Sequence, residues 1–271
     1  MGSDMNSIQS QHVVLHEKNT RRVYEQELIG EEPLLVLIEG HPYSVVMRTP
    51  GEEIFHVAGF CLGEGLVDYR NDFATISHCD ESDSNVISVT LEAERKKKVA
   101  TLLERRGFIS QTSCGICGKE MIKDLYQIVA PVVDERRISI SEAISCIDQL
   151  TRHQDFYERT GASHGVMVFG SKLNVLALAE DVGRHNALDK AIGKVFINGK
   201  LAEARLAVLS SRVSYELVQK GARAGLSILI SLSRPTALAV ELGRSLNMTL
   251  ICAGNGPGLM VFCGEERVTR K

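Results

Sequence analysis

The sequence predicts an α/β protein: a C-terminal part built on a sheet with helices on both faces, preceded by a smaller α+β part. Three observations predict this fold class. Short apolar stretches bounded by polar turns recur through the second half of the chain. Stretches of helical length lie between them, and strands separated by helices of about 10–15 residues are typical of βαβ units. No repeat at a fixed period and no low-complexity segment interrupts this alternation.

The N-terminal part is expected to combine strands with two helices. Residues up to about Thr20 are polar and indicate a frayed segment or a sheet edge, and Met1–Asp4 resembles a cloning remnant. Thr49, Pro50 and Glu52 have the spacing of a capping box with proline at the first helical position. The predicted strands are Val23–Leu28, Leu34–Ile38, Tyr43–Met47, Phe73–His78 and Val86–Leu91, and the predicted helices are Pro50–Glu64 and Glu92–Arg106.

The rest of the chain alternates strands with helices after a glycine-rich loop at Gly107–Gly118. Ser139 or Ser141 can cap the second of the helices that follow. The predicted helices are Lys119–Val129, Ser141–Tyr157, Asn186–Phe196, Tyr215–Ala222 and Thr236–Leu246, and the predicted strands are His164–Phe169, Val175–Ala179, Leu206–Leu209, Ile228–Leu232, Thr249–Ala253 and Leu259–Cys263. We therefore divide the chain into a remnant with a flexible N-terminus (1–20), a small α+β domain (21–110), a CxxC loop with a connecting helix (111–137) and an α/β domain (138–271).

Composition excludes several classes of function. The 31 Lys and Arg against 34 Asp and Glu give a net charge of −3 without a basic stripe, and Trp is absent, which disfavours a nucleic-acid binder. No apolar run approaches the roughly 18 residues of a membrane span. The first residues lack the order of a signal peptide. Seven cysteines, an odd number, fit reduced thiols, so we expect a cytoplasmic protein.

The pair Cys114 and Cys117, in the order Cys-Gly-Ile-Cys, is the sharpest chemical signal. A structural zinc site needs about four ligands, and no second close pair is present, so we predict no structural metal. A redox dithiol remains open, as do two ordinary buried cysteines in a turn. The third interpretation is a sulfur-carrying cysteine. Gly115 and Gly118 leave backbone amides free near an anionic sulfur, and Lys119 with a following helix N-terminus adds positive potential.

Polar clusters that contain arginine follow three predicted strands. They are Glu180–Asn186, Ser210–Arg212 and Ser231–Thr236, and a fourth strand is followed by the glycine-rich Gly254–Gly258. In open α/β sheets ligands bind outside the carboxyl ends of strands, where helix N-termini, hydroxyls and arginine suit phosphate. Alternatively, each Ser or Asp simply caps the next helix, and the glycines form a hairpin loop. Three arginine clusters favour an anion pocket. His164 and His185 are given no catalytic role.

Several segments together resemble the FdhD/NarQ family of formate dehydrogenase accessory sulfurtransferases. The residues that carry the resemblance are Ser113–Gly118, Thr160–His164, Glu180–Lys190 (EDVGRHNALDK), Ser210–Glu216 (SSRVSYE), Thr49-Pro50, Gly59-Phe60, Glu64-Gly65 and Ser233–Thr236. The resemblance runs from about Leu34 to Val261. The CxxC pair alone is a weak signal, whereas EDVGRHNALDK followed by SSRVSYE is specific.

The resemblance implies a cytidine-deaminase-like, three-layer C-terminal domain and a cytoplasmic, dimeric protein. It does not imply deamination, because zinc deaminases need H-x-E and P-C-x-x-C. No His here is followed two residues later by Glu, and Ser113 precedes the CxxC pair. The implied partners are a cysteine desulfurase and the catalytic subunit of formate dehydrogenase, with no nucleic acid and no membrane.

The resemblance also implies site residues. Cys114 matches the persulfide-bearing cysteine and Cys117 the second cysteine. The site for the guanine dinucleotide of a molybdenum or tungsten cofactor carries over to Ala253–Gly258, although family members often have Phe and Arg there, and GDP is the expected mimic. With the strand-end clusters, the candidate cofactor-binding residues are Ala253, Gly254, Asn255, Gly256, Pro257, Gly258, Asp181, Arg184, Ser210, Ser211, Arg212, Arg234 and Thr236.

The resulting hypothesis is a sulfurtransferase. It passes persulfide sulfur from a cysteine desulfurase to the molybdenum or tungsten bis(guanine dinucleotide) cofactor before that cofactor enters formate dehydrogenase. The alternatives are a cofactor-binding chaperone that moves no sulfur, and a CxxC dithiol oxidoreductase. The sequence leaves open which metal is used, which desulfurase and client take part, what Cys117 does, and how sulfur travels from the loop to the pocket.

Overall fold

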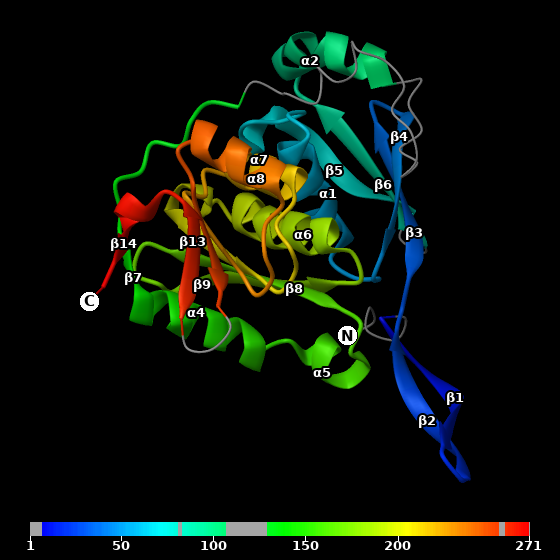
Figure 1. Ribbon diagram of the computed structural model, residues 1–271. Helices are drawn as coiled ribbons and strands as arrows, with labels where there is room; N and C mark the ends of the chain where they lie inside the picture. The colour runs from blue at the N-terminus through cyan, green and yellow to red at the C-terminus, as the bar shows by residue number, and fades with distance from the viewer. Residues whose placement is uncertain (1–6, 81–82, 107–128, 255–257, 271) are drawn as a thin grey trace.

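The α/β fold class is confirmed in the computed structural model (Figure 1). The structure describes residues 7–80, 83–106, 129–254 and 258–270, without the side chains of residues 83, 101–102 and 104–106. The C-terminal part contains a six-stranded sheet. Its order is β13 (Leu259–Cys263), β12 (Thr249–Ala253), β11 (Ile228–Ser231), β10 (Ala204–Leu209), β8 (His164–Gly170) and β9 (Val175–Asp181). Strands β9 to β12 run in one direction, and β8 and β13 run against them.

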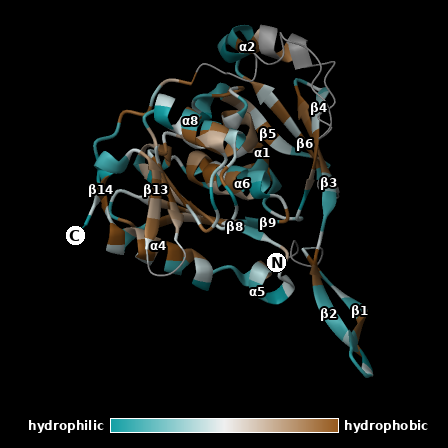
Figure 2. Ribbon diagram, in the orientation of Figure 1, coloured by the Kyte–Doolittle hydropathy of each residue, from teal (hydrophilic) through white to brown (hydrophobic). Residues whose placement is uncertain are grey.

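Helices cover both faces of this sheet, which gives three layers (Figure 1). On one face α4 (Ile140–Arg152) packs Cys146 and Leu150 against strand residues such as Phe169. On the other face lie α6 (Arg184–Ile197), α7 (Tyr215–Arg223) and α8 (Ala237–Ser245). Apolar residues concentrate where these layers meet (Figure 2). The cytidine-deaminase-like description is more specific than this layering and stays a prediction.

The N-terminal part contains a four-stranded sheet beside helix α1 (Glu53–Gly63). The sheet order is β4 (His41–Arg48), β3 (Glu32–Ile38), β6 (Asp83–Leu91) and β5 (Phe73–Asp80), followed in the chain by α2 (Ala93–Arg106). The predicted capping box at the start of α1 is wrong. The helix begins later, its N-cap Glu52 makes no side-chain cap bond, and the Thr49 hydroxyl instead accepts a hydrogen bond from the Val182 amide at 3.0 Å.

Helices α1 and α6 join the two parts into one hydrophobic core. Residues of the four-stranded sheet, of α1 and of α6 and α7 belong to a single buried cluster. The two helices cross at backbone contact, because a Cβ on Gly59 would collide with the Asp189 carbonyl and one on Gly193 with the Phe55 carbonyl. The predicted domain boundaries stay a prediction, but the parts on either side of residues 110–138 share this core.

Residues 8–29 form a two-stranded hairpin, which we name the arm. Strand β1 (Ile8–Glu17) pairs along its whole length with β2 (Thr20–Ile29), and the pair projects away from the body (Figure 1). Of the two alternatives for the residues up to Thr20, a frayed segment or a sheet edge, the strand β1 fits the sheet edge over residues 8–17. Paired hydrogen bonding, rather than apolar burial, defines this strand, so its polar sequence concealed it.

The remaining elements are short. The helix predicted over Ser141–Tyr157 is two helices, α4 and α5 (Asp155–Thr160), with Ser139 as the N-cap of α4 in a capping box with Glu142. Strands β7 (Ile138–Ser139) and β14 (Val268–Thr269) pair in parallel. Single 3₁₀ turns occur at Arg70–Asp72, Leu201–Glu203 and Glu265–Arg267. Within the described ranges, no helix is both long and apolar enough to cross a membrane.

Candidate functional site

The predicted polar clusters emerge at one edge of the six-stranded sheet, which we name the carboxyl edge. Strands β9, β10, β11 and β12 run in the same direction and end there at Asp181, Leu209, Ser231 and Ala253. The antiparallel strand β8 begins at the same edge, where His164 pairs with Asp181. The topology thus brings together four segments that are far apart in the sequence.

The hydroxyl groups predicted to bind a ligand at this edge form hydrogen bonds with the protein backbone. Ser210 Oγ accepts a hydrogen bond from the Gly165 amide at 2.9 Å. The buried Ser211 donates to the Arg212 carbonyl at 3.0 Å. Thr236 is the N-cap of α8 and accepts from the Ala239 amide at 3.2 Å. These three side chains therefore build the edge, and at Thr236 the helix-cap interpretation holds.

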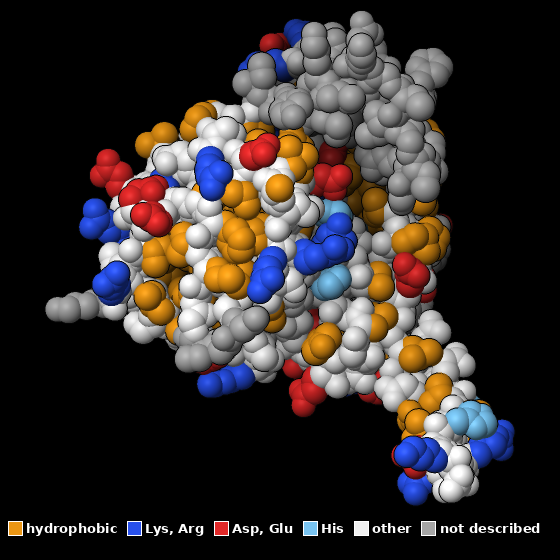
Figure 3. All heavy atoms as spheres, viewed as in Figure 1, with side chains coloured by type: hydrophobic (Ala, Val, Ile, Leu, Met, Phe, Trp, Pro, Cys, Tyr) orange, Lys and Arg blue, Asp and Glu red, His pale blue; other side chains and the backbone are white. Residues whose placement is uncertain are grey.

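The three predicted arginines are the open charges of the edge. Arg212 and Arg234 are exposed, and Arg184 is partly buried at the start of α6. Within the described part of the chain, none of them forms an ion pair, and Arg184 Nε is buried without a hydrogen-bond partner. In Figure 3, basic and histidine side chains gather over the region that Figure 1 labels α6. Three unpaired guanidinium groups after strands that end at the same edge of the sheet suit an anionic ligand.

Two histidines share this edge and were given no role from the sequence. Burial lowers the pKa of His164, and the positive charges of Arg184 and Arg212 lower it further, whereas Asp181 opposes the shift. His185 Nε2 lies 3.0 Å from the Glu216 carboxylate and 3.2 Å from Ser214 Oγ. The hydrogen bond from His185 lowers the pKa of Glu216. The lowered pKa favours the neutral imidazole of His164 beside these cations. The sequence signal that could have indicated His164 was its position at the start of a predicted strand.

The prediction that Asp181 contacts a ligand does not fit the structure, because its side chain is 0% exposed. Its carboxylate accepts hydrogen bonds from the backbone amides of Thr49 at 3.1 Å and Gly183 at 2.8 Å and from the side-chain Nδ2 of Asn186 at 2.9 Å. It also pairs with Lys190 Nζ at 2.8 Å, and Lys190 donates to the Thr49 carbonyl at 2.8 Å. A fully satisfied buried carboxylate holds structure in place.

A second buried ion pair lies beside the first, because its Asp189 directly precedes Lys190 in α6. Asp189 accepts two hydrogen bonds from Lys220 at 2.8 and 2.7 Å, and Lys220 Nζ also lies 5.4 Å from the centre of the Phe60 ring. Burial raises the pKa of Asp189 to about 6 although Lys220 opposes this. We name the α1–α6 crossing together with the pairs Asp181–Lys190 and Asp189–Lys220 the helix seam. It fixes the start of α6, and with it Arg184, against the N-terminal sheet.

The glycine-rich segment is partly described. Ala253 and Gly258 flank the connection between the antiparallel strands β12 and β13, and the Gly254 amide donates to the Gly258 carbonyl at 2.8 Å. A Cβ on Gly254 would crowd the Gly258 carbonyl at 2.7 Å. The hairpin-loop interpretation therefore accounts for Gly254. Asn255, Gly256 and Pro257 lie outside the described residues, as do Cys114 and Cys117, so the predictions for these five residues stay predictions.

One further thiol lies at the edge. Cys252 is buried near the end of β12, where it pairs with Ser231 of β11 and Met260 of β13. Burial raises its pKa, and only the nearby Arg234 opposes the shift. The thiol is therefore neutral and covered. The other described cysteines, Cys61, Cys79, Cys146 and Cys263, are also free.

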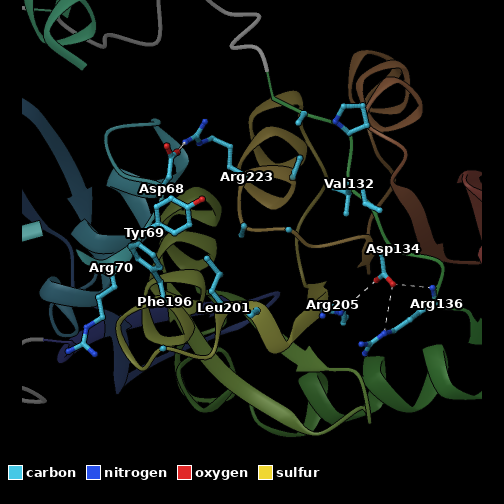
Figure 4. Close-up of a pocket in the computed structure, with 18 of the residues that line it drawn as sticks. Asp68, Tyr69, Arg70, Val132, Asp134, Arg136, Phe196, Leu201, Arg205 and Arg223 are labelled. Atoms are coloured by element: carbon cyan, nitrogen blue, oxygen red, sulfur yellow. Dashed lines mark hydrogen bonds and ion pairs between the residues drawn. The ribbon is translucent and has the colours of Figure 1, made fainter. Parts of the chain in front are cut away.

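A cavity of about 880 Å³ opens at the opposite end of the sheet, where β10 and β11 begin (Figure 4). Its wall includes Asp68 and Tyr69, residues 130–136 and the ends of α6 and α7. Most of its charges are paired with one another: Arg223 lies 2.7 Å from Asp68, and both Arg136 and Arg205 lie within 4.0 Å of Asp134. The sequence contained no motif for this cavity, and its cations are less available than those of the carboxyl edge.

The comparisons with known proteins agree with one another. Residues 29–269 match the FdhD/NarQ family model. A sulfur carrier protein FdhD of Mycobacterium tuberculosis is 36% identical over 256 residues, covering 90% of this chain and 92% of that protein. The sulfur carrier protein FdhD of Anaeromyxobacter dehalogenans is 34% identical over 251 residues, covering 88% and 87%.

A solved structure supports the fold over nearly the whole chain. It is a crystal structure of a formate dehydrogenase accessory protein from Desulfotalea psychrophila, with a TM-score of 0.76 and 22% identity over 97% of this chain and 99% of that one. The extent of the family match, which includes the carboxyl edge and the helix seam, leads to one conclusion: this chain belongs to the FdhD/NarQ family.

Proposed function

We propose that this protein is a sulfur carrier that accepts sulfur as a persulfide on Cys114 and delivers it to a metal cofactor destined for formate dehydrogenase. Family membership supports sulfur transfer, because the similar proteins are named sulfur carriers and the similar solved structure is called a formate dehydrogenase accessory protein. The observation that carries the cofactor part is the carboxyl edge, where Arg184, Arg212 and Arg234 follow β9, β10 and β11 and form no ion pair with any described residue.

In the first step of our proposal, Cys114 receives a sulfur atom from the persulfide of a cysteine desulfurase. The Cys114 thiolate attacks the outer sulfur of the desulfurase persulfide, the sulfur–sulfur bond of the donor breaks, and the desulfurase cysteine leaves as a thiolate. Cys114 then holds a persulfide. This step needs a thiolate, and a free cysteine with a pKa near 8.5 supplies only a few per cent of it at neutral pH.

Delivery requires two electrons, because sulfane sulfur must leave as sulfide. In our proposal the Cys117 thiolate attacks Cys114 at its inner sulfur, which forms a Cys114–Cys117 disulfide and releases hydrosulfide. The hydrosulfide replaces an oxygen ligand on the molybdenum or tungsten of the substrate cofactor, and that oxygen takes the hydrosulfide proton and one proton from solvent and leaves as water. A cellular thiol reductant then restores both cysteines.

The carboxyl edge is the proposed site for the nucleotide arms of this substrate. A bis(guanine dinucleotide) carries two diphosphates, and guanidinium groups bind phosphate oxygens in a bidentate manner. The N-terminus of α6, whose N-cap Gly183 carries no side chain, adds backbone amides and the positive end of the helix dipole. His164 remains neutral there and can donate one hydrogen bond.

The sulfur carrier proposal is tested by the mass of each cysteine after incubation with a cysteine desulfurase and L-cysteine. We expect one added sulfur, about 32 Da, on Cys114, and no addition in Cys114→Ser. Cys79 is exposed and free, so Cys79→Ser is the matched control and should load like the wild type. Addition to Cys79 alone, or to Cys146 or Cys252, would contradict the proposal.

The nucleotide site is tested by titration with GDP. Arg212→Ala and Arg234→Ala should each weaken binding by about tenfold or more, since a charge-assisted hydrogen bond contributes roughly 1.5–3 kcal/mol. Arg70→Ala is the control, because Arg70 is also exposed but lines the cavity at the opposite end of the sheet. Unchanged affinity in both edge variants would refute the site. Full formate dehydrogenase activity with Cys114→Ala, but not with the arginine variants, would instead support a chaperone that moves no sulfur.

A further inference from the structure

His185 connects the two segments of the carboxyl edge that carry Arg184 and Arg212. In the sheet, β8 lies between β9 and β10, so Arg184, after β9, and Arg212, after β10, stand on either side of the start of β8. His185 is the second residue of α6, and its side chain contacts residues at the start of α7, which follows β10. The imidazole therefore reaches from the segment after β9 to the segment after β10. Figure 3 shows histidine side chains among the basic ones in this region.

One ring nitrogen holds the imidazole in place. His185 Nε2 lies 3.0 Å from the Glu216 carboxylate and 3.2 Å from Ser214 Oγ. Ser214 is the N-cap residue of α7, where a serine usually accepts a hydrogen bond from the helix, but its side chain makes no cap bond. In a serine–histidine–acid triad the serine and the acid contact opposite nitrogens of the ring. Here they share one nitrogen, so Ser214 is a support for the ring and not an activated nucleophile.

The other ring nitrogen is available to a ligand. His185 Nδ1 forms no hydrogen bond with a described residue, and the side chain is 30% exposed. The hydrogen bond from His185 lowers the pKa of Glu216, so this carboxylate carries its charge. A carboxylate at hydrogen-bonding distance stabilises a positive imidazole ring, which has two N–H groups. One N–H is directed to Glu216, and the second can be given to a bound molecule.

The other titratable groups in the described part of the carboxyl edge are less suited to give a proton. Burial and the charge of Arg184 lower the pKa of His164, which favours its neutral form. Asp181 is buried in its ion pair with Lys190. Burial raises the pKa of Cys252, and the thiol is covered. His185, with its carboxylate partner and partial exposure, is the group that combines a proton with access to a ligand.

The proposed delivery of sulfur needs a proton at this edge. The oxygen that leaves the metal takes one proton from hydrosulfide and requires a second to become water. In a bis(guanine dinucleotide) the metal lies between the two nucleotide arms, and the unpaired arginines suit the phosphates of those arms. The imidazole of His185 reaches between two of these arginine segments. Proton transfer from a positioned side chain, most often histidine, raises a rate by about 10²–10⁴-fold.

We propose that His185 is the general acid of the delivery step. The N–H bond at Nδ1 breaks, the leaving oxygen takes this proton together with the proton of hydrosulfide, and it departs as water. His185 becomes neutral and regains a proton from solvent, while Glu216 and Ser214 hold the ring through Nε2. The inference rests on the sulfur carrier proposal and adds a catalytic residue to it.

The first test is the rate at which the full-length protein, loaded with sulfur on Cys114, sulfurates saturating molybdenum bis(guanine dinucleotide) cofactor, followed by the mass of the cofactor. His185→Gln keeps an N–H for Glu216 but has no proton to give, and it should lower this rate near neutral pH by about 100-fold or more. Loading of Cys114 should match the wild type. His41→Gln is the matched control, because His41 is exposed at the start of β4 in the other sheet, and its rate should be unchanged.

The second test is the pH dependence of the same rate. The described groups whose charges act on His185 or on its partner Glu216 are Asp189, Lys220, Arg184 and His164. Asp189 is paired with Lys220, so Glu216 is the open carboxylate beside the ring. The rate of the wild type divided by that of His185→Gln should fall from about pH 6 to about pH 9, because histidine loses its proton over this range. The ratio cancels the ionisation of the thiols, which both proteins share.

Glu216→Gln tests the positioning role of the carboxylate. The variant lacks the negative charge that stabilises the protonated ring. Its rate should fall by about tenfold near pH 8 and by less near pH 6, where the ring is protonated without help. A loss of the same size at both pH values would mean that Glu216 supports the structure only, and would contradict this role.

The third test supplies the missing acid from solution. His185→Ala leaves room beside Glu216, so added imidazole should restore its rate in proportion to the concentration of imidazolium. His185→Gln fills that room and should not respond. Restoration of the rate also shows that the alanine variant is folded.

The remaining outcomes separate this inference from the sulfur carrier proposal. A wild type that loads Cys114 but never sulfurates the cofactor would overturn both. Delivery by His185→Gln at the wild-type rate would overturn the general acid alone. A variant with weaker GDP binding but the wild-type rate at saturating cofactor would make His185 a binding residue, which also overturns the proposal. Loss of Cys114 loading in His185→Gln and His185→Ala, without rescue by imidazole, would do the same.

Discussion

The carboxyl edge and the helix seam draw on the same segment, Glu180–Lys190, yet they treat charge in opposite ways. At the seam, Asp181 pairs with Lys190 and Asp189 with Lys220, and these side chains are buried. At the edge, Arg184, Arg212 and Arg234 form no ion pair with any described residue. The contrast shows that one sequence motif supplies both kinds of charge. Its Asp181, Asp189 and Lys190 are buried in ion pairs, whereas its Arg184 lies at the edge without one. Variants of the two regions should therefore separate stability from ligand binding.

The largest effect is expected where the seam has no space. Gly193→Ala would place a methyl group against the Phe55 carbonyl, and backbone on both sides cannot yield as a side chain would. Overpacking costs about 1–3 kcal/mol where side chains can move, and this contact should exceed that range. Chemical denaturation checks it. Gly258→Ala, which would meet nothing within 4 Å, should leave the free energy of unfolding unchanged.

The next effect concerns the buried charges of the seam. Lys220→Met leaves Asp189 buried without its partner and should lower the free energy of unfolding by about 3–5 kcal/mol. Adding Asp189→Asn to this variant should recover a large part of the loss, because no uncompensated charge then remains. A double variant as unstable as Lys220→Met alone would show that the pair does not act through charge.

The same pair predicts a pH dependence of stability. The folded pKa of Asp189, about 6, lies above its ordinary value of 3.8, so the folded state holds its proton to higher pH than the unfolded state. The stability from this group is fully present below pH 3.8 and is lost as pH rises toward and through 6. The stability of the wild type relative to Asp189→Asn/Lys220→Met should therefore fall between pH 4 and 6. A difference that rises over this range would contradict the shift.

A smaller effect is expected at the helix cap of the edge. Thr236→Ala removes the hydrogen bond to the Ala239 amide and should cost about 1 kcal/mol, whereas Thr236→Ser keeps the cap and should cost less. GDP affinity measured on both variants sharpens the comparison. A loss of affinity in Thr236→Ser, with stability kept, would assign the threonine to ligand binding rather than to capping.

The smallest effect on stability is expected for the open arginines. Arg212→Ala and Arg234→Ala should change the free energy of unfolding by no more than about 0.5 kcal/mol, because exposed side chains without partners contribute little. Their GDP affinity should fall as described above. A marked fall in the free energy of unfolding of either variant would contradict the distinction between the carboxyl edge and the helix seam, because the edge arginines would then also stabilise the fold.

Much of the architecture could be predicted from local sequence signals. Apolar stretches located the strands of both sheets, and Ser139 was one of two predicted caps for α4. The convergence of the strand-end clusters was also predictable, because strands that run in one direction end at the same edge of a sheet. For β1 the sequence indicated only a frayed segment or a sheet edge, because most of its residues are polar and both of its faces lie open.

The sequence by itself determined the fold class, the family and the list of polar residues at the strand ends. Only the tertiary structure decided which of them are open. Asp181 and Arg184 are three residues apart, but Asp181 meets Thr49, 132 positions earlier in the chain, and is fully buried. A side chain at a strand end can turn into the core or out of it, and the choice depends on distant partners that arrive only when the two sheets pack on α1 and α6. The same holds for the Thr49 hydroxyl, which accepts a hydrogen bond from the Val182 amide instead of capping the nearby helix α1.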